Sequence, residues 1–301
     1  MSVDAWQTRR PLLPELALIG ATIAYGGTFK IVQDALEHLT PVGFILLRFI
    51  VGTLALTPIA LRRGWRRPGV DARLRDFWWA ALAFGIVGFG GYWLQNVGLE
   101  RTTTSNSAFI TGLFVVFTAL IETAVTRKAP SRNVLVAVCV SAVGLFLLTG
   151  ASFRIGAGDA LTLGCSVMFA IWIVLGGTLS QRYDPIALTA AQMAVLAVCA
   201  APVVLVTGLG EVTAGALAAV VFTGVVCSAI AFTLQLWGQR SLAPSRAAVI
   251  LLFEPVVAGF VGYLVGERLG VAGYCGAAVI FGGIVLAESH AWRRGRAELP
   301  T

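Results

Sequence analysis

Residues 40–61 have the sequence TPVGFILLRFIVGTLALTPIAL, an apolar run in which Arg48 is the one charged residue. A helix needs about 20 consecutive apolar residues to cross the hydrocarbon core of a bilayer. Four arginines follow the run between residues 62 and 67, and an excess of basic residues beside an apolar run marks its cytoplasmic end. This stretch therefore predicts a membrane-spanning helix that ends in the cytoplasm.

The rest of the 301-residue chain has the same character, because hydrophobic residues make up 57% of it and charged residues only 12%. Soluble domains carry about 25% charged residues. The first run is not predicted to be a cleaved signal peptide, because it reaches Lys30 without an Ala-x-Ala site and further runs follow it. We predict an all-α integral membrane protein with ten transmembrane helices, at 15–33, 40–61, 76–97, 105–126, 132–150, 157–180, 185–207, 214–238, 245–265 and 269–288.

The orientation of these helices follows from the distribution of basic residues. With the N-terminus in the cytoplasm, 17 of the 22 lysines and arginines lie on the cytoplasmic side and four lie outside, Arg48 being the remaining one. The excess of basic residues on one side predicts that both termini and the loop 62–75 are cytoplasmic. The net charge of +7 is explained by this topology and by contact with anionic lipid headgroups, so no nucleic-acid partner is predicted.

The two halves of the chain resemble each other in two registers. The first register aligns 94–127 with 234–267 without a gap and gives eight identities, among them Leu94-Gln95-x-x-Gly98 with Leu234-Gln235-x-x-Gly238. The second register pairs Tyr25-Gly26 with Phe169-Ala170 and Pro41 with Pro185. Each half holds five predicted spans, and an odd number makes the second copy enter the membrane upside-down. We predict two domains, 1–150 and 151–301, that form inverted repeats with a substrate site between them near the middle of the membrane.

Several motifs in register with this repeat resemble a known family, the EamA repeats of the drug/metabolite transporter superfamily. The motifs of the second repeat are Gly158-Asp159-Ala160-Leu161 with Ala170, then 247–257 (AAVILLFEPVV), Gly266-Glu267-Arg268-Leu269, Gly273 and Gly282-Gly283. In the first repeat, Tyr25-Gly26 stands where many members have Trp-Gly, and Leu47-Arg48-Phe49 matches Leu-Arg-Phe. The resemblance covers nearly the whole chain, from residue 15 to residue 288.

This resemblance implies a ten-helix carrier of the bacterial inner membrane, an exporter of amino acids, metabolites or drugs, working as a monomer or homodimer. Two positions depart from the family pattern. Val115-Val116 stands in place of Pro-Val, and Arg127 stands in place of the glutamate that follows the fourth span. The motif residues of the two repeats are therefore not expected to act symmetrically.

Three ionisable residues fall inside predicted spans, where charge is costly and marks function or essential pairing. Glu254 is the deepest, and Pro255 beside it removes a helix hydrogen bond and clashes with the carbonyl of Leu251. Glu254 therefore either binds substrate or protons, or pairs with a cation such as Arg48. Glu122 lies near the cytoplasmic end of its span, where snorkelling or pairing with basic loop residues is the simpler interpretation.

Gln95 and Gln235 are paired by the repeat and lie inside spans, where an amide offers donors and an acceptor without charge. They either bind a zwitterionic or neutral polar solute or form hydrogen bonds between helices. Nearby aromatic side chains either form stacking and cation–π walls or pack the interior. The candidate substrate-binding residues are Tyr25, Tyr92, Gln95, Trp172, Gln235, Trp237 and Glu254.

Other chemistries lack their motifs in this sequence. There is no Gly-x-x-x-x-Gly-Lys-Ser/Thr for ATP, the five cysteines have no metal-site or disulfide spacing, and the two histidines, His38 and His290, lie outside the spans. We expect no metal, no cofactor and no enzyme activity, but a secondary transporter whose partners are a small-molecule substrate, membrane lipids and, where Glu254 titrates, protons. The rival interpretations are a membrane enzyme acting on a lipid-linked substrate, which needs convergent catalytic residues, and a scaffold without solute flux.

The topology is tested with single cysteines introduced by Val70→Cys and Glu298→Cys in a variant that lacks the five native cysteines. Both positions are expected to resist impermeant thiol reagents in intact cells, because they face the cytoplasm. Permeabilised cells, in which both positions react, provide the control. Labelling of both positions from outside intact cells would contradict the topology.

Overall fold

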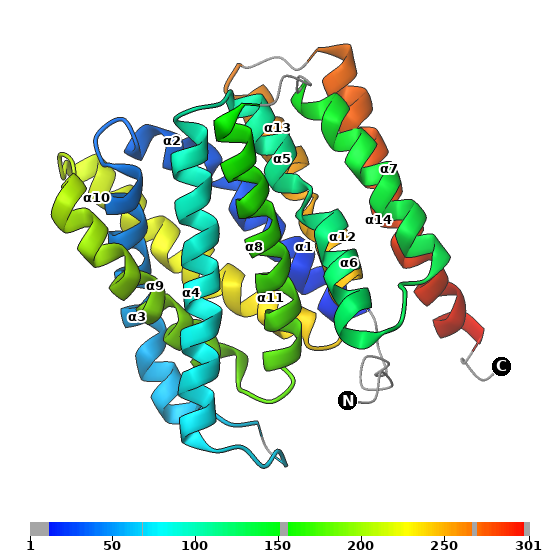
Figure 1. The fold of residues 1–301 in the computed structure, drawn as a ribbon, viewed down its shortest axis with the longest axis horizontal. Helices are drawn as coiled ribbons and strands as arrows, with labels where there is room; N and C mark the ends of the chain where they lie inside the picture. The colour runs from blue at the N-terminus through cyan, green and yellow to red at the C-terminus, as the bar shows by residue number, and fades with distance from the viewer. Residues whose placement is uncertain (1–11, 68, 151–155, 267–269, 298–301) are drawn as a thin grey trace.

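The computed structural model describes residues 12–67, 69–150, 156–266 and 270–297, and the elements within these ranges are helices (Figure 1). They are α1 (Leu12–Gly27), α2 (Phe29–Ala35), α3 (Pro41–Arg63), α4 (Leu74–Leu99), α5 (Thr104–Gly112), α6 (Phe114–Thr126), α7 (Arg132–Thr149), α8 (Ala157–Leu179), α9 (Pro185–Thr207), α10 (Ala214–Thr223), a π-helical segment (Gly224–Ala231), α11 (Phe232–Gln239), α12 (Pro244–Leu251), α13 (Glu254–Leu264) and α14 (Val271–Ala297).

Nine helical segments of the described residues are long and apolar enough to span a bilayer, and a tenth apolar segment, Val271–Ala287, is shorter. These segments coincide with the ten predicted runs to within a few residues, so the prediction of an all-α membrane protein is confirmed. In chain order they are spans 1 to 10. Span 1 comprises α1 and α2, span 4 comprises α5 and α6, span 8 comprises α10, the π-helical segment and α11, and span 9 comprises α12 and α13.

Spans 2 and 7 begin in the same way. Pro41 and Pro185 lie in the first turn of their helices, where a proline costs no hydrogen bond and its fixed backbone angle favours the helix. The Thr40 hydroxyl accepts a hydrogen bond from the N–H of Gly43 (3.1 Å), and the Asp184 carboxylate accepts bonds from the first turn of α9. These caps satisfy N–H groups that the helix leaves without partners.

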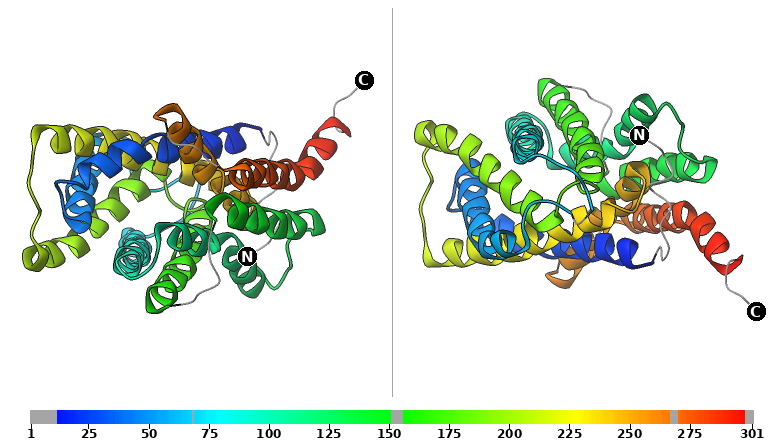
Figure 2. Two further views of the ribbon diagram at one scale, coloured as in Figure 1. Left: turned by 90° about the horizontal axis from the view of Figure 1, so that it is seen from above. Right: turned by 90° about the horizontal axis from the view of Figure 1, so that it is seen from below.

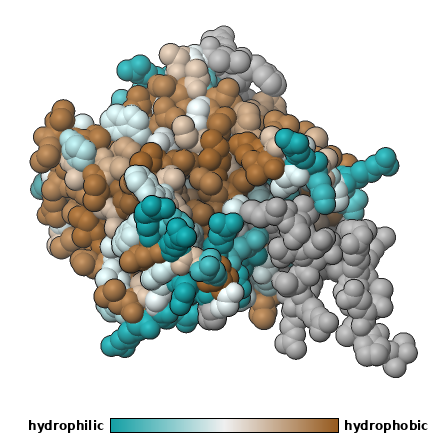
Figure 3. Space-filling model, turned by 60° about the horizontal axis from the view of Figure 1, so that its bottom comes forward, coloured by the Kyte–Doolittle hydropathy of each residue, from teal (hydrophilic) through white to brown (hydrophobic). Residues whose placement is uncertain are grey.

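The outer surface of the bundle is apolar. Leu61, Leu205 and Val271 are 79%, 88% and 82% exposed, and Figure 3 shows hydrophobic residues across the flank of the bundle, with hydrophilic residues gathered toward one end. Trp78 and Trp79, at the start of α4, are also exposed. Side chains of this kind need lipid as their solvent, and tryptophan prefers the membrane–water interface.

The main helix pairs each join one span of the first half to one span of the second. The most extensively packed pairs are α7 with α14, α3 with α9, α4 with α8 and α4 with α9. Figures 1 and 2 show α7 and α14 side by side at one edge of the bundle. We call the end with the α3–α4 loop (64–73), at the bottom of Figure 1, the arginine end, and the other end, with the α2–α3 loop, the far end.

Short antiparallel backbone contacts join loops of the two halves at both ends. At the far end Leu39 pairs with Gly210, and at the arginine end Tyr183 pairs with Arg66. The second register of the repeat, which pairs Pro41 with Pro185, also relates Leu39 to Tyr183 and Arg66 to Gly210. The two contacts are therefore the same contact, formed once at each end of the bundle. The bonds are Thr40 N–H to Leu209 O (3.0 Å) and Glu211 N–H to His38 O (2.8 Å), repeated as Asp184 N–H to Trp65 O (3.1 Å) and Arg67 N–H to Arg182 O (3.4 Å).

Two glycines that the repeat pairs occupy matching close contacts. A Cβ on Gly98 of α4 would lie 2.6 Å from Thr162 Oγ1 and 3.0 Å from Gly158 O of α8. A Cβ on Gly238 of α11 would lie 2.7 Å from the carbonyl oxygen of Pro14 in α1. The second register relates Pro14 to Gly158, so the two glycines face repeat-related partners. Each half of the chain therefore supplies one glycine to an equivalent contact. Glycine here lets backbones approach.

Spans 1, 4, 8 and 9 are interrupted. Span 9 breaks at residues 252–253, beside Pro255, whose missing N–H was expected to remove the helix hydrogen bond to the carbonyl of Leu251. Spans 1 and 4 break at Thr28 and Leu113, and neither break was predicted. The Thr28 hydroxyl donates to the carbonyl oxygens of two residues in the preceding turn (2.8 and 3.1 Å), and such bonds bend helices.

The close approaches are tested by Gly98→Ala and Gly238→Ala. Each methyl group is forced against backbone atoms, so we expect each variant to lose about 1–3 kcal/mol of stability, measured as a lower thermal unfolding midpoint of the purified protein. Gly282→Ala is the matched control, because a Cβ there has no atom within 4 Å. Equal midpoints for all three variants would show that these contacts are not tight.

Candidate functional site

A cavity of about 330 Å³ lies where the interrupted spans meet. Its wall includes Thr28 of span 1, Phe114 of span 4, Cys227 of span 8 and Glu254 of span 9, each in or beside an interruption. Irregular backbone inside a membrane protein is tolerated where it lines a cavity. Six of the seven predicted site residues line this one, namely Tyr25, Tyr92, Gln95, Trp172, Gln235 and Glu254.

Trp237 is the seventh, and the structure places it elsewhere. The guanidinium of Arg240 lies over its ring, 4.7 Å from the centroid, in a cation–π contact. The reason is helical geometry, because two residues along an α-helix turn a side chain by about 200°. Gln235 therefore faces the cavity while Trp237 faces another direction.

The aromatic walls of the cavity are related by the repeat. Tyr25 and Phe232 meet edge to face with ring centroids 5.8 Å apart, and Phe169 and Tyr92 do the same at 5.4 Å. The second register relates Tyr25 to Phe169, and the first register, extended by two residues, relates Tyr92 to Phe232. Edge-to-face packing is a favoured geometry for aromatic pairs, so both halves hold a firm aromatic surface against the cavity.

Trp172 is held rigidly between the cavity and the core. Its ring stacks on Phe84 with centroids 5.3 Å apart, and its indole N–H donates to the Gln192 Oε1 atom at 3.1 Å. With its polar atom satisfied inside the protein, the indole offers the cavity an apolar face. This wall suits an apolar group on a ligand.

The two amides of the cavity have different partners. The hydroxyl of Tyr25 donates to Gln235 Oε1 at 2.8 Å, and Gln235 is 2% exposed. Its Nε2 has no hydrogen-bond partner among the described residues. Gln95 donates through Nε2 to the Thr111 hydroxyl over 3.4 Å, a long bond. A buried donor without a partner is costly, so the Gln235 amide is a group to which a ligand or water would bind.

The cavity also carries one group of each charge. Arg48 Nε donates to the hydroxyl of Ser228 at 2.7 Å. Glu254 is the first residue of α13 and is exposed, although it lies in the middle of span 9, because its side chain lines the cavity. Within the described part of the chain the two residues form no ion pair with each other or with other residues, so both charges remain available to a ligand.

Glu122 is not part of the cavity. Its carboxylate Oε2 accepts a hydrogen bond from the backbone N–H of Ser245 at 2.7 Å, at the start of α12. The expected pairing with basic loop residues is thus replaced by a bond to the amino end of a helix, where the helix dipole favours negative charge. Glu122 thus joins span 4 to span 9.

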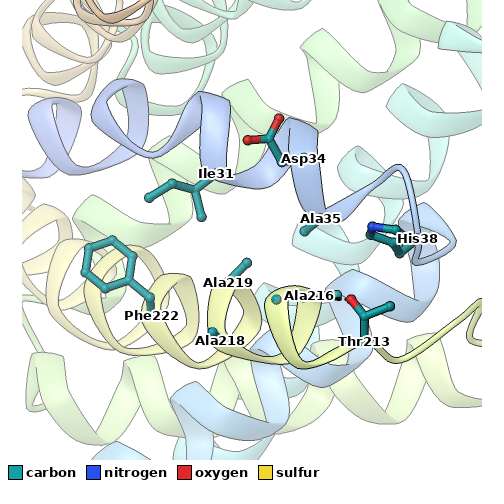
Figure 4. Close-up of a pocket in the computed structure, with 10 residues that line it drawn as sticks. Ile31, Asp34, Ala35, His38, Thr213, Ala216, Ala218, Ala219 and Phe222 are labelled. Carbon is teal, nitrogen blue, oxygen red and sulfur yellow. Dashed lines mark hydrogen bonds between the residues drawn. The ribbon is translucent and has the colours of Figure 1, made fainter. Parts of the chain in front are cut away.

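Figure 4 shows a second hollow, of about 460 Å³, between α2 and α10 at the far end. Alanines and Phe222 of α10 form one wall, and Ile31 and Asp34 of α2 form the other. The carboxylate of Asp34 already pairs with Lys30 at 2.8 Å. Although this groove is larger, it offers fewer uncommitted polar groups than the central cavity, which is therefore the better candidate site.

Thr28, Thr111 and Phe232 line the cavity but were not predicted. Phe232 could have been found as the partner of Tyr92 in the first register of the repeat. Single threonines in apolar spans carry no such signal, since most of them bond to their own helix. Within the described residues no group of three His, Cys, Asp or Glu side chains is placed to hold a metal ion.

A membrane-embedded helical bundle with a polar cavity at broken helices is typical of the class of membrane transporters. The sequence comparison agrees with this class. The chain belongs to the EamA-like transporter family, whose sequence pattern it matches twice, over residues 12–150 and 156–288.

Proteins with similar sequences are named as transporters. An uncharacterized transporter of Archaeoglobus fulgidus is 30% identical over 92% of this chain and 86% of its own length. A probable terminal-alkyne amino-acid exporter of Streptantibioticus cattleyicolor is 26% identical over 85% of this chain and 90% of its own. A solved crystal structure shares the fold, with a TM-score of 0.78 at 18% identity over 93% of this chain and 98% of that one.

Proposed function

We propose that this protein is a secondary transporter that exports a small zwitterionic solute, an amino acid or a close relative, across the bacterial inner membrane. The observation that carries the proposal is the composition of the central cavity, which holds one guanidinium, one carboxylate, two amides and aromatic walls. A carboxylate on the solute suits Arg48 and an ammonium suits Glu254. The aromatic rings suit an apolar or aromatic side chain.

The direction of transport rests on orientation and on one relative. The proposed topology places the arginine end in the cytoplasm, following the distribution of basic residues. The relative from Streptantibioticus cattleyicolor is named as a probable amino-acid exporter, which supports export of the same class of solute by this chain.

Alternating access is supported by two closing contacts that the repeat relates to each other. At the arginine end Arg246 of span 9 pairs with Glu15 of span 1 at 2.9 Å. At the far end Asp159 of span 6 accepts hydrogen bonds from the Thr102 hydroxyl and from Asn106 of span 4. The second register relates Glu15 to Asp159, and the first register relates Asn106 to Arg246. Each contact joins the first half, 1–150, to the second, 151–301, so in this proposal the halves rock and open one contact at a time.

Glu254 is our candidate for coupling to protons. A carboxylate that binds either a proton or the ammonium of the solute exchanges one for the other as the cavity changes sides. The alternative of a structural pair with Arg48 receives less support, because the Arg48 guanidinium bonds to a serine hydroxyl.

Counterflow in proteoliposomes tests the function. Liposomes loaded with an unlabelled amino acid should accumulate the same labelled amino acid, for at least one member of a panel of neutral and aromatic amino acids. Glu254→Gln should abolish flux driven by a pH gradient but preserve exchange at saturating solute, because exchange needs no net proton movement. Absence of counterflow for every amino acid in the panel would overturn the proposal. If exchange and thermal stability both fall in Glu254→Gln, Glu254 has a structural role.

The closing contacts are tested by Arg246→Asn, which gives the arginine end the residue found at the far end, and by Thr102→Val. The substitution Thr111→Cys places a thiol in the cavity wall, and the reaction of this thiol with an impermeant reagent reports access to the cavity. Losing a bond to a charged group costs about 1.5–3 kcal/mol, so labelling from the arginine side should rise about tenfold in Arg246→Asn and fall in Thr102→Val. Equal labelling from both sides of the membrane in wild type and both variants would count against alternating access.

A further inference from the structure

We propose that the two repeat-related amides of the cavity present opposite groups to the substrate, Gln235 a hydrogen-bond donor and Gln95 an acceptor. A zwitterionic solute then binds in one orientation, with its carboxylate at Gln235 and its ammonium at Gln95. This inference rests on the proposed function, which names the zwitterion, and adds the orientation and the residue that sets it.

Gln235 offers a donor because its acceptor is taken. The Tyr25 hydroxyl donates to Gln235 Oε1 at 2.8 Å, which fixes the plane of the amide and leaves Nε2 as its uncommitted group. That atom is buried, lies in a side chain that is 2% exposed, and has no partner among the described residues. A buried amide N–H₂ without an acceptor is stabilised by any ligand that brings one, and a carboxylate oxygen is the strongest acceptor available.

Gln95 offers an acceptor because the corresponding tyrosine is absent. The residue that the repeat pairs with Tyr25 is Phe169, which lines the cavity but has no hydroxyl. Gln95 Nε2 is directed instead to the Thr111 hydroxyl, at 3.4 Å. No described residue donates to the Gln95 carbonyl oxygen, and the side chain is half-buried, so this oxygen is open to an ammonium group.

The charged residues fit the same assignment. The Arg48 guanidinium of span 2 is bonded to Ser228 of span 8 at 2.7 Å, seven residues before Gln235 in the same span. Two donors of the cavity, the Arg48 guanidinium and the Gln235 amide, are thus associated with span 8, and a carboxylate binds to donors. The Glu254 carboxylate and the Gln95 carbonyl oxygen are acceptors in the same cavity, and an ammonium binds to acceptors. The pattern discriminates against solutes that carry only one of the two charges.

Tyr25 is the positioning residue in this scheme. It acts through Gln235, because its hydroxyl decides which end of the amide faces the substrate. The asymmetry between Tyr25 and Phe169 therefore converts two equivalent amides into a donor and an acceptor. Without the hydroxyl, the Gln235 amide is free to turn and to present either end.

The matched variants Gln235→Glu and Gln95→Glu test the assignment, since both replace an amide by an acceptor of nearly the same shape. The probes are labelled L-phenylalanine in counterflow, with 2-phenylethylamine, which lacks the carboxylate, and 3-phenylpropionate, which lacks the ammonium, as competitors. Gln235→Glu should weaken the binding of L-phenylalanine and 3-phenylpropionate about tenfold or more and leave the binding of 2-phenylethylamine unchanged. Gln95→Glu should strengthen the binding of 2-phenylethylamine, because a carboxylate accepts from an ammonium more strongly than an amide oxygen does, and should not weaken the binding of L-phenylalanine as Gln235→Glu does. Purified variants with wild-type unfolding midpoints establish that folding is intact.

Tyr25→Phe separates positioning from a general structural effect. It should weaken competition by 3-phenylpropionate and leave competition by 2-phenylethylamine unchanged, whereas a distorted cavity would weaken competition by both compounds. Equal effects of the two glutamate variants, or the reverse pattern of effects, overturn the assignment of Gln235 as donor and Gln95 as acceptor. The proposed function still stands in that case, provided that the wild-type protein exchanges the amino acid. If the wild-type protein exchanges another neutral amino acid in the panel, its own amine and acid analogues serve as competitors. Absence of exchange for every amino acid overturns the proposed function and this inference with it.

Discussion

A bilayer supplies no water to hydrogen-bond an exposed peptide group, and this constraint decides where the chain is regular. Spans 2, 3, 5, 6, 7 and 10 are continuous helices, whereas spans 1, 4, 8 and 9 are interrupted, and all four interrupted spans contribute to one cavity. Side chains take over some of the freed backbone groups, as the Thr28 hydroxyl does. The irregular backbone therefore requires an enclosed polar space, and the same space is available for binding.

The sequence was sufficient for the spans because their signal, a long apolar run with charged flanks, depends on the bilayer and not on tertiary contacts. It was also sufficient for the lost helix hydrogen bond at Pro255, because a missing N–H has a local effect. The break at Leu113 has no proline nearby, and Gly112 beside it packs so closely on Leu145 that a Cβ there would overlap the leucine side chain. Such contacts leave no local pattern in the sequence.

For the site, polar residues in apolar spans were the informative signal, and Gln95, Gln235 and Glu254 all line the cavity. Aromatic residues were less informative, since they are also at home in the core and at the interface. Trp237 was chosen for its closeness to Gln235 in sequence, whereas helical periodicity points it away. Similarly, the bond from Ser245 to Glu122 joins residues far apart in the sequence and could not be foreseen. Relations between distant residues become visible only in the folded chain.

The antiparallel backbone contacts between loops bear on how such a molecule moves. They tie α3 to α9 at the far end through Leu39 and Gly210 and at the arginine end through Tyr183 and Arg66. Backbone bonds at both ends oppose separation of the two helices at either end, so this edge of the bundle stays closed along its whole length while those bonds persist. Any opening of the cavity toward one side of the membrane is then left to the other spans, and the α3–α9 edge is the part of the framework that changes least.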